Sequence, residues 1–128
     1  MKITSADKFR NALATLVEFL DEPVETKRDV AGVLQGFAFT FELAWKATQD
    51  HISALGYLQR GPRPSLQAGV ETGLIRPEEA EGWSSMLEDR NLVSHVYRPE
   101  WALELVERIR TQHLPLLISL AERLHPLL

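Results

Sequence analysis

The sequence predicts an all-α protein, an antiparallel up-and-down bundle of four long helices plus one short helix. Apolar residues recur at helical spacing through most of the chain, whereas no stretch shows the alternation that is typical of strands. Prolines and glycines divide the chain into five helical segments. The length of 128 residues suits one domain that spans residues 1–128 and buries a real core.

Composition places the chain among ordinary globular proteins, with 45% hydrophobic and 25% charged residues. The formal net charge of −4 supplies no long-range basic field, so any contact with RNA must come from a local patch. The absence of cysteine excludes disulfides, thiolate catalysis and cysteine-based metal sites, and favours the cytoplasm. We expect no membrane span and no signal peptide, because no apolar run is long enough.

The first two helices have clear boundaries in the sequence. Thr4 predicts an N-cap, with Asp7 completing a variant of the capping box, and the helix should end before Pro23. The second helix should run from about Thr26 to Leu55, because Gly56 is typical of a position just beyond a helix C-terminus.

The second helix carries two apolar faces and therefore needs two neighbours. Gly32 and Gly36 lie on the smaller face, and each costs about 1 kcal/mol relative to alanine in a helix interior. This cost predicts close packing against another helix of the chain or against the same helix of a second subunit. The main face holds Val30, Val33, Leu34, Phe37, Phe41, Ala44, Trp45, Thr48, Ile52 and Leu55.

Proline and glycine also mark the remaining helices. Pro62 should open a short helix that Gly73 closes, and Pro77 should start the fourth helix. The final helix should run from Pro99 to about Leu124, with a kink where Pro115 removes one backbone hydrogen bond.

The fourth helix places polar groups on its apolar side. At about 100° per residue, Arg90 and Ser94 fall within roughly 20° of Trp83. Burying an unpaired arginine would cost several kcal/mol. Arg90 must therefore pair with a carboxylate such as Glu42 or Asp89, or face a cleft or a second subunit.

The neighbours of Arg90 suggest chemistry on a phosphodiester. Arg90 supplies a permanent cation, Asn91 an amide, His95 an imidazole and Tyr97 a phenol. His95 lies near the helix C-terminus, whose partial negative charge favours a protonated imidazole. Arg90 and His95 point about 140° apart on an ideal helix, so they meet only if the helix loosens near Tyr97 or if two copies of the motif meet across a dimer. This geometry favours a composite site.

Other site classes fit the sequence poorly. The four histidines show no HxxxH or ExxH spacing, and no glycine-rich nucleotide motif is present, so we expect neither a bound metal nor a cofactor. Ser94 and His95 are adjacent on a helix and point about 100° apart, which disfavours a serine hydrolase. His113 lies on an apolar stripe and is expected to be a satisfied core or edge histidine.

Residues 90–97 match the R-x4-H-x-Y motif of HEPN-domain proteins. Residues 36–46, 68–75 and 86–91 resemble the nucleotidyltransferase substrate-binding, HepT-like toxin subfamily of that family, and the similarity extends over residues 7–120. The motif alone is weakly specific, but the combination in this order is much more so. Gly69 stands where alanine is more usual and Pro64 is an additional proline, and neither touches the motif.

The resemblance implies a homodimeric bundle encoded beside a minimal nucleotidyltransferase. In toxin members of the family the motif is a metal-independent ribonuclease site, and the partner enzyme silences it by adding AMP to the motif tyrosine. An alternative is a non-catalytic substrate-binding subunit of that nucleotidyltransferase. A third possibility is a structural dimer in which Arg90 is merely paired.

The roles implied by the resemblance transfer residue by residue to this sequence. His95 would act as general acid and base, and Arg90 would stabilise the charged phosphorane. Asn91 would orient the phosphate or the imidazole, and Tyr97 would receive AMP. Apart from the resemblance, we expect Ser94 and Arg98 to contribute to substrate binding, with Arg98 and Arg60 or Arg63 forming a basic cleft beside Arg90.

Overall fold

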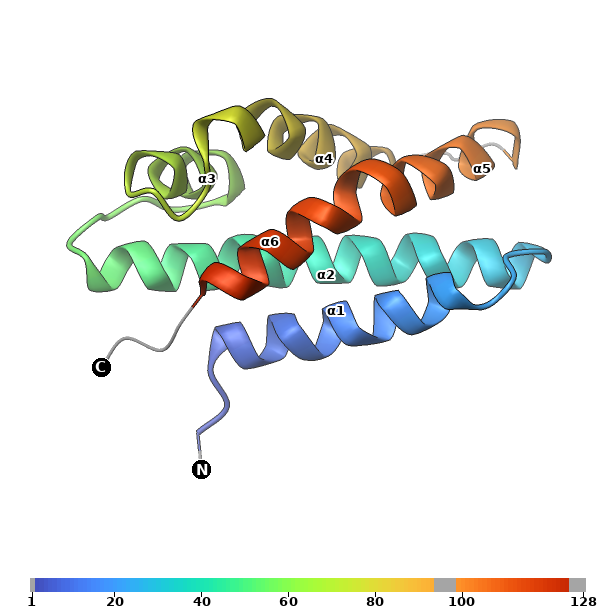
Figure 1. Ribbon diagram of the computed structural model, residues 1–128, viewed down its shortest axis with the longest axis horizontal. Coiled ribbons are helices and arrows are strands. Elements are labelled where there is room, and N and C mark those ends of the chain that lie inside the picture. The colour runs from blue at the N-terminus through green and yellow to red at the C-terminus, as the bar shows by residue number, and fades with distance from the viewer. Residues whose placement is uncertain (1, 94–98, 125–128) are drawn as a thin grey trace.

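The computed structural model describes residues 2–93 and 99–124, and all the regular secondary structure in these residues is helical (Figure 1). The α-helices are α1 (Ser5–Asp21), α2 (Lys27–Ala54), α3 (Pro62–Glu71), α4 (Ala80–Val93), α5 (Pro99–Arg108) and α6 (Leu114–Arg123). A 3-10 turn, Pro77–Glu79, precedes α4, and a π-helical turn, Ile109–His113, joins α5 to α6.

The long helices alternate in direction around α2, which confirms the predicted bundle (Figure 1). Helix α1 runs antiparallel to α2 along one side, and α4 runs antiparallel to α2 along another. The continuous α5–α6 segment returns across the bundle, while short α3 lies beside the C-terminal half of α2. The predicted short helix is therefore α3, and the predicted final helix is α5–α6.

Side-chain caps set the starts of the first two helices. Thr4 Oγ1 accepts a hydrogen bond from the Asp7 amide and Asp7 Oδ2 accepts one from the Thr4 amide, both at 3.1 Å. Thr26 and Asp29 repeat this reciprocal arrangement at the start of α2. Each pair satisfies amide groups that have no partner inside the helix, so both starts lie where the sequence places them.

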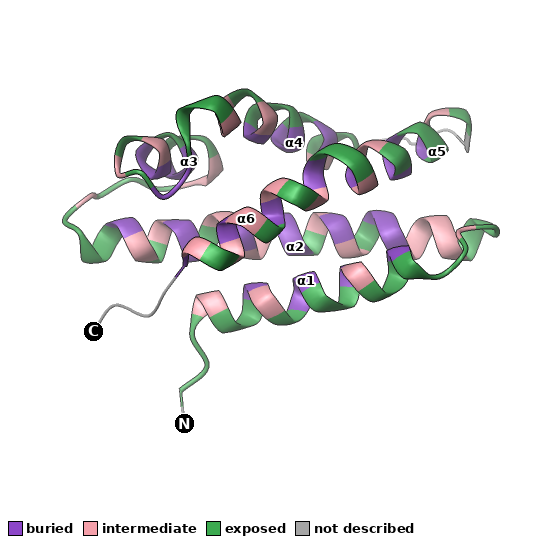
Figure 2. Cartoon of the chain, viewed as in Figure 1, coloured by how far each residue is buried: buried purple, intermediate pink, exposed green. Residues whose placement is uncertain are grey.

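The main face of α2 forms the centre of the core, as the purple segments of Figure 2 show. Phe37 and Phe41 are completely buried there. The prediction that Leu55 belongs to this apolar face is wrong. Leu55 is 51% exposed, because α2 ends at Ala54 and Leu55 follows the last turn.

The smaller face of α2 packs against α1, so the neighbour of its glycines belongs to the same chain. A methyl group added to Gly36 would lie 3.7 Å from Leu16 and 3.8 Å from Phe19. These are ordinary van der Waals distances, so the helices do not approach closely enough to require glycine. Phe39, further along this face, remains 61% exposed.

The final helix bends through a π-helical turn rather than at a simple proline kink. The Leu114 amide donates to the Ile109 carbonyl, five residues earlier. This wider turn immediately precedes Pro115, whose ring would otherwise crowd the carbonyl four residues before it. The bend also brings His113 into the core, where the side chain is buried.

We expect Gly36→Ala to raise the free energy of unfolding by about 0.5–1 kcal/mol, because alanine restricts the unfolded chain and finds space against α1. Chemical denaturation measures this change. Gly69→Ala is the matched control and should gain less, because its added methyl group would lie 3.1 Å from Ile75 and 3.2 Å from Thr48. Destabilisation by Gly36→Ala would contradict the packing described for α1 and α2.

Candidate functional site

Arg90 pairs across the α2–α4 interface with Glu42, one of the carboxylates suggested by the sequence. The distance from Arg90 Nη1 to Glu42 Oε2 is 3.5 Å, and the guanidinium carbon lies 5.5 Å from the Phe41 ring centre. The Arg90 side chain remains 23% exposed. Its Nε is buried without a hydrogen-bond acceptor among the described residues. Glu42 therefore neutralises the guanidinium only in part.

The other candidate carboxylate, Asp89, belongs to a separate buried cluster. Arg108 donates to its two oxygens, from Nε at 3.0 Å and from Nη2 at 2.9 Å. His113 Nε2 lies 2.6 Å from Asp89 Oδ2, and the imidazole stacks on Phe37. This arrangement joins α4 to both halves of the bent final helix.

The Asp89 cluster holds its carboxylate ionised. Burial by itself raises the pKa of Asp89, but hydrogen bonds and charges from His113 and Arg108 outweigh burial and lower this pKa from 3.8 to about 2. The hydrogen bond to Asp89 in turn raises the pKa of Arg108. We expected His113 to be a satisfied core or edge histidine. It is buried and its Nε2 contacts Asp89, but its Nδ1 has no hydrogen-bond partner among the described residues, so the side chain is only half satisfied. The partners escaped detection because they lie 19 and 24 residues away from Asp89.

The remaining proposed site residues lie at or beyond the end of α4. Asn91 is exposed in the last turn of that helix, beside Arg90. Ser94, His95, Tyr97 and Arg98 fall outside the described residues, so their expected roles remain predictions. The structure thus places the cation and the amide together on α4.

Two further properties concern the described parts of the chain alone. Within residues 2–93 and 99–124, no group of three or more histidine, aspartate or glutamate side chains is arranged to hold a metal ion. No helix in the same residues is sufficiently long and apolar to cross a membrane.

Comparison with known families identifies the class of protein. The family model described as nucleotidyltransferase substrate binding protein like matches residues 4–126, so the chain belongs to this family. The helical bundle is similar to the crystal structure of a protein from Thermus thermophilus, with 29% sequence identity and a TM-score of 0.83. The alignment covers 92% of this chain and 99% of that protein. The search of curated proteins finds no match.

We expect Arg90→Met to change the free energy of unfolding by less than about 1 kcal/mol, because the Glu42 pair is long and partly exposed. Arg108→Met is the matched control. It should cost about 3 kcal/mol, because it removes two hydrogen bonds from buried Asp89. Urea denaturation of both variants measures the difference, and equal losses would contradict the distinct environments of the two arginines.

The lowered pKa of Asp89 predicts that the free energy of unfolding decreases in acid. Its folded-state pKa lies below the unfolded value, so its contribution is present above about pH 4 and disappears as the pH falls towards 2. The difference in pKa corresponds to about 2 kcal/mol. Wild-type protein should lose this increment over that range, whereas Asp89→Asn should not. The free energy of unfolding of both proteins is measured from pH 5 to pH 2. An equal decrease in the two proteins would refute the lowered pKa of Asp89.

Proposed function

We propose that this protein is a metal-independent ribonuclease toxin that works with a minimal nucleotidyltransferase antitoxin. The partner silences the toxin by transferring AMP from ATP to the Tyr97 hydroxyl, which forms a phosphodiester and releases pyrophosphate. The observation that carries this proposal is the incompletely neutralised Arg90 guanidinium at the end of α4, beside exposed Asn91. A guanidinium with one long carboxylate contact can donate hydrogen bonds to an RNA phosphate more readily than one that already has a bidentate carboxylate partner.

The chemistry needs only groups that the motif supplies. The 2′-hydroxyl of RNA attacks the adjacent phosphorus, and the bond from phosphorus to the 5′-oxygen breaks. His95 transfers the proton between attacking and leaving oxygens, leaving a 2′,3′-cyclic phosphate and a 5′-hydroxyl. Arg90 stabilises the charge that develops on the phosphorane, and Asn91 orients the phosphate or the imidazole. Ser94 and Arg98 assist substrate binding.

A homodimer supplies the geometry that one helix lacks. Residues five apart on an ideal helix diverge by about 140°, so Arg90 and His95 of one chain would not converge on one phosphate if α4 continued regularly to His95. A second copy brings a second set of these groups to a shared cleft. AMP on Tyr97 adds a bulky anion two residues from His95, which blocks RNA by occupancy and by charge repulsion.

A second candidate function is that of a non-catalytic subunit that provides the nucleotidyltransferase with a docking surface. The description of the family favours this function. The contact of Glu42 with Arg90 also supports it, because the guanidinium already has a carboxylate partner that a phosphate would have to displace. This candidate predicts a stable complex and no RNA cleavage by unmodified dimer.

The deciding experiment compares protein expressed alone with protein co-expressed with its nucleotidyltransferase, by intact mass and by RNA cleavage. We expect unmodified dimer to cleave RNA, and co-expression to add the mass of AMP and abolish cleavage. His95→Ala should be inactive, whereas His51→Ala, a histidine on α2, should retain activity.

Cleavage by His95→Ala at the wild-type rate would overturn the ribonuclease mechanism. Absence of cleavage by unmodified wild-type dimer, together with a stable complex, would establish the docking subunit instead. An AMP adduct that persists in Tyr97→Phe would refute Tyr97 as the modified residue.

A further inference from the structure

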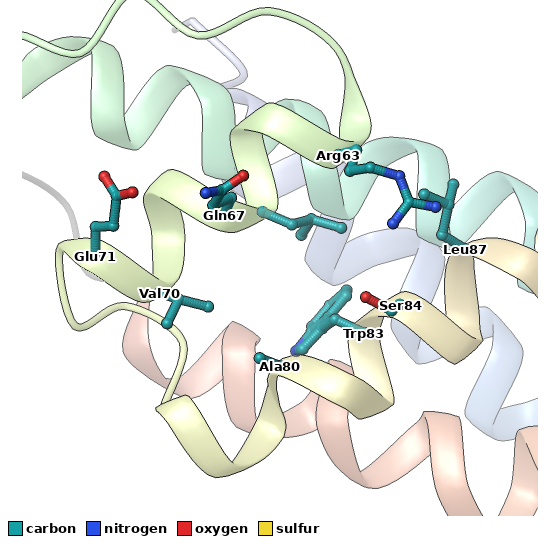
Figure 3. A pocket seen from close by; sticks show the side chains of 9 residues that line it. Arg63, Gln67, Val70, Glu71, Ala80, Trp83, Ser84 and Leu87 are labelled. Carbon is teal, nitrogen blue, oxygen red and sulfur yellow. The ribbon is translucent and has the colours of Figure 1, made fainter.

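A groove of about 450 Å³ lies between α3 and the first half of α4 (Figure 3). Its floor consists of buried apolar side chains, Leu66 from α3 and Trp83 and Leu87 from α4. The volume lies within the range of small-molecule sites in proteins. The groove is therefore large enough to take one nucleotide-sized ligand.

Small residues on α4 keep this groove open. Ala80 and Ser84 lie four residues apart and so face the same direction on the helix, where larger side chains would fill the space. The opposite rim on α3 consists of Arg63, Gln67 and Glu71, again spaced by four residues. At 1.5 Å per residue, the α-carbons of Arg63 and Glu71 are about 12 Å apart along α3.

The polar rim has opposite charges at its two ends. Figure 3 shows Arg63 beside Leu87 at one end of the groove and Glu71 at the other. Within the described residues, the side chains of Arg63, Gln67 and Glu71 have no hydrogen-bond or ion-pair partner. The hydroxyl of Ser84 is equally unpaired there. These groups are available to a ligand without breaking an internal interaction.

We propose that the α3–α4 groove binds a nucleoside monophosphate unit whose base carries an exocyclic amino group. The planar base lies on the apolar floor, and its amino group donates to the Glu71 carboxylate. The phosphate binds the Arg63 guanidinium at the opposite end. A single cation on a protein of net charge −4 favours one phosphate over a triphosphate.

The same chemistry occurs in a free nucleotide and in one residue of an RNA chain. Helix α4 continues from Leu87 to Arg90 within one turn, so the Arg63 end of the groove is the end nearer Arg90. A ribonucleotide in the groove would therefore direct its phosphate towards Arg90. Binding of the free nucleotide does not depend on RNA cleavage, so the two proposals fail separately.

Isothermal titration with AMP, adenosine, UMP and ATP tests the groove. We expect AMP to bind at least about tenfold more tightly than adenosine, which lacks the phosphate, and than UMP, which lacks the amino group. ATP should bind more weakly than AMP. Arg63→Gln should reduce the affinity for AMP to that for adenosine, whereas Arg60→Gln, with the same loss of charge outside the groove, should leave it unchanged.

A filled groove gives the matched structural test. Ser84→Trp should abolish AMP binding, whereas Ser85→Trp, on the neighbouring exposed residue outside the groove, should not. Equal AMP affinity in these two variants, or no heat with wild-type protein at millimolar AMP, would overturn the proposal. Titration with a 2′-O-methylated RNA, which cannot be cleaved, distinguishes a free nucleotide from a residue of RNA as the ligand. If Ser84→Trp also weakens binding of this RNA, the groove takes a residue of RNA. If binding of the RNA is unchanged, the groove takes the free nucleotide.

Discussion

The arrangement of α4, α5 and the π-helical turn depends on the contacts of the buried Asp89 carboxylate with Arg108 and His113. The carboxylate accepts hydrogen bonds from Arg108 in α5 and contacts His113 in the π-helical turn, so one side chain of α4 fixes the returning helix at two points. Removal of either partner would leave a carboxylate under-satisfied in the core, which is far more costly than loss of a surface pair. The bend before Pro115 and the position of α4 are thereby coupled.

Three consecutive residues of α4 serve three different purposes, because each successive side chain turns by about 100°. Asp89 points into the core, Arg90 points across to Glu42 on α2, and Asn91 points to solvent. The rigid attachment of Asp89 holds its neighbours in place. The cation and the amide of the proposed site thus rest on a buried cluster that takes no part in the proposed chemistry.

The environment of Arg90 bears on both proposed functions. Its contact with Glu42 is long and leaves Nε without an acceptor among the described residues, so the pair offsets part of the cost of burying the cation. A phosphate could replace this carboxylate with better geometry. The same contact gives the arginine a structural partner, so it is compatible with either proposed function.

Local sequence determined the helical fold, the two capping boxes and the proline boundaries, because caps and periodicity act over one or two turns. It also placed an arginine on an apolar face and indicated that it needs a carboxylate such as Glu42 or Asp89, a cleft or a second subunit. Only the tertiary structure decided that Glu42 takes Arg90 while Asp89 binds Arg108 and His113. Such pairings, like the α3–α4 groove, depend on the relative positions of helices, which packing of the entire core sets and helical periodicity does not encode.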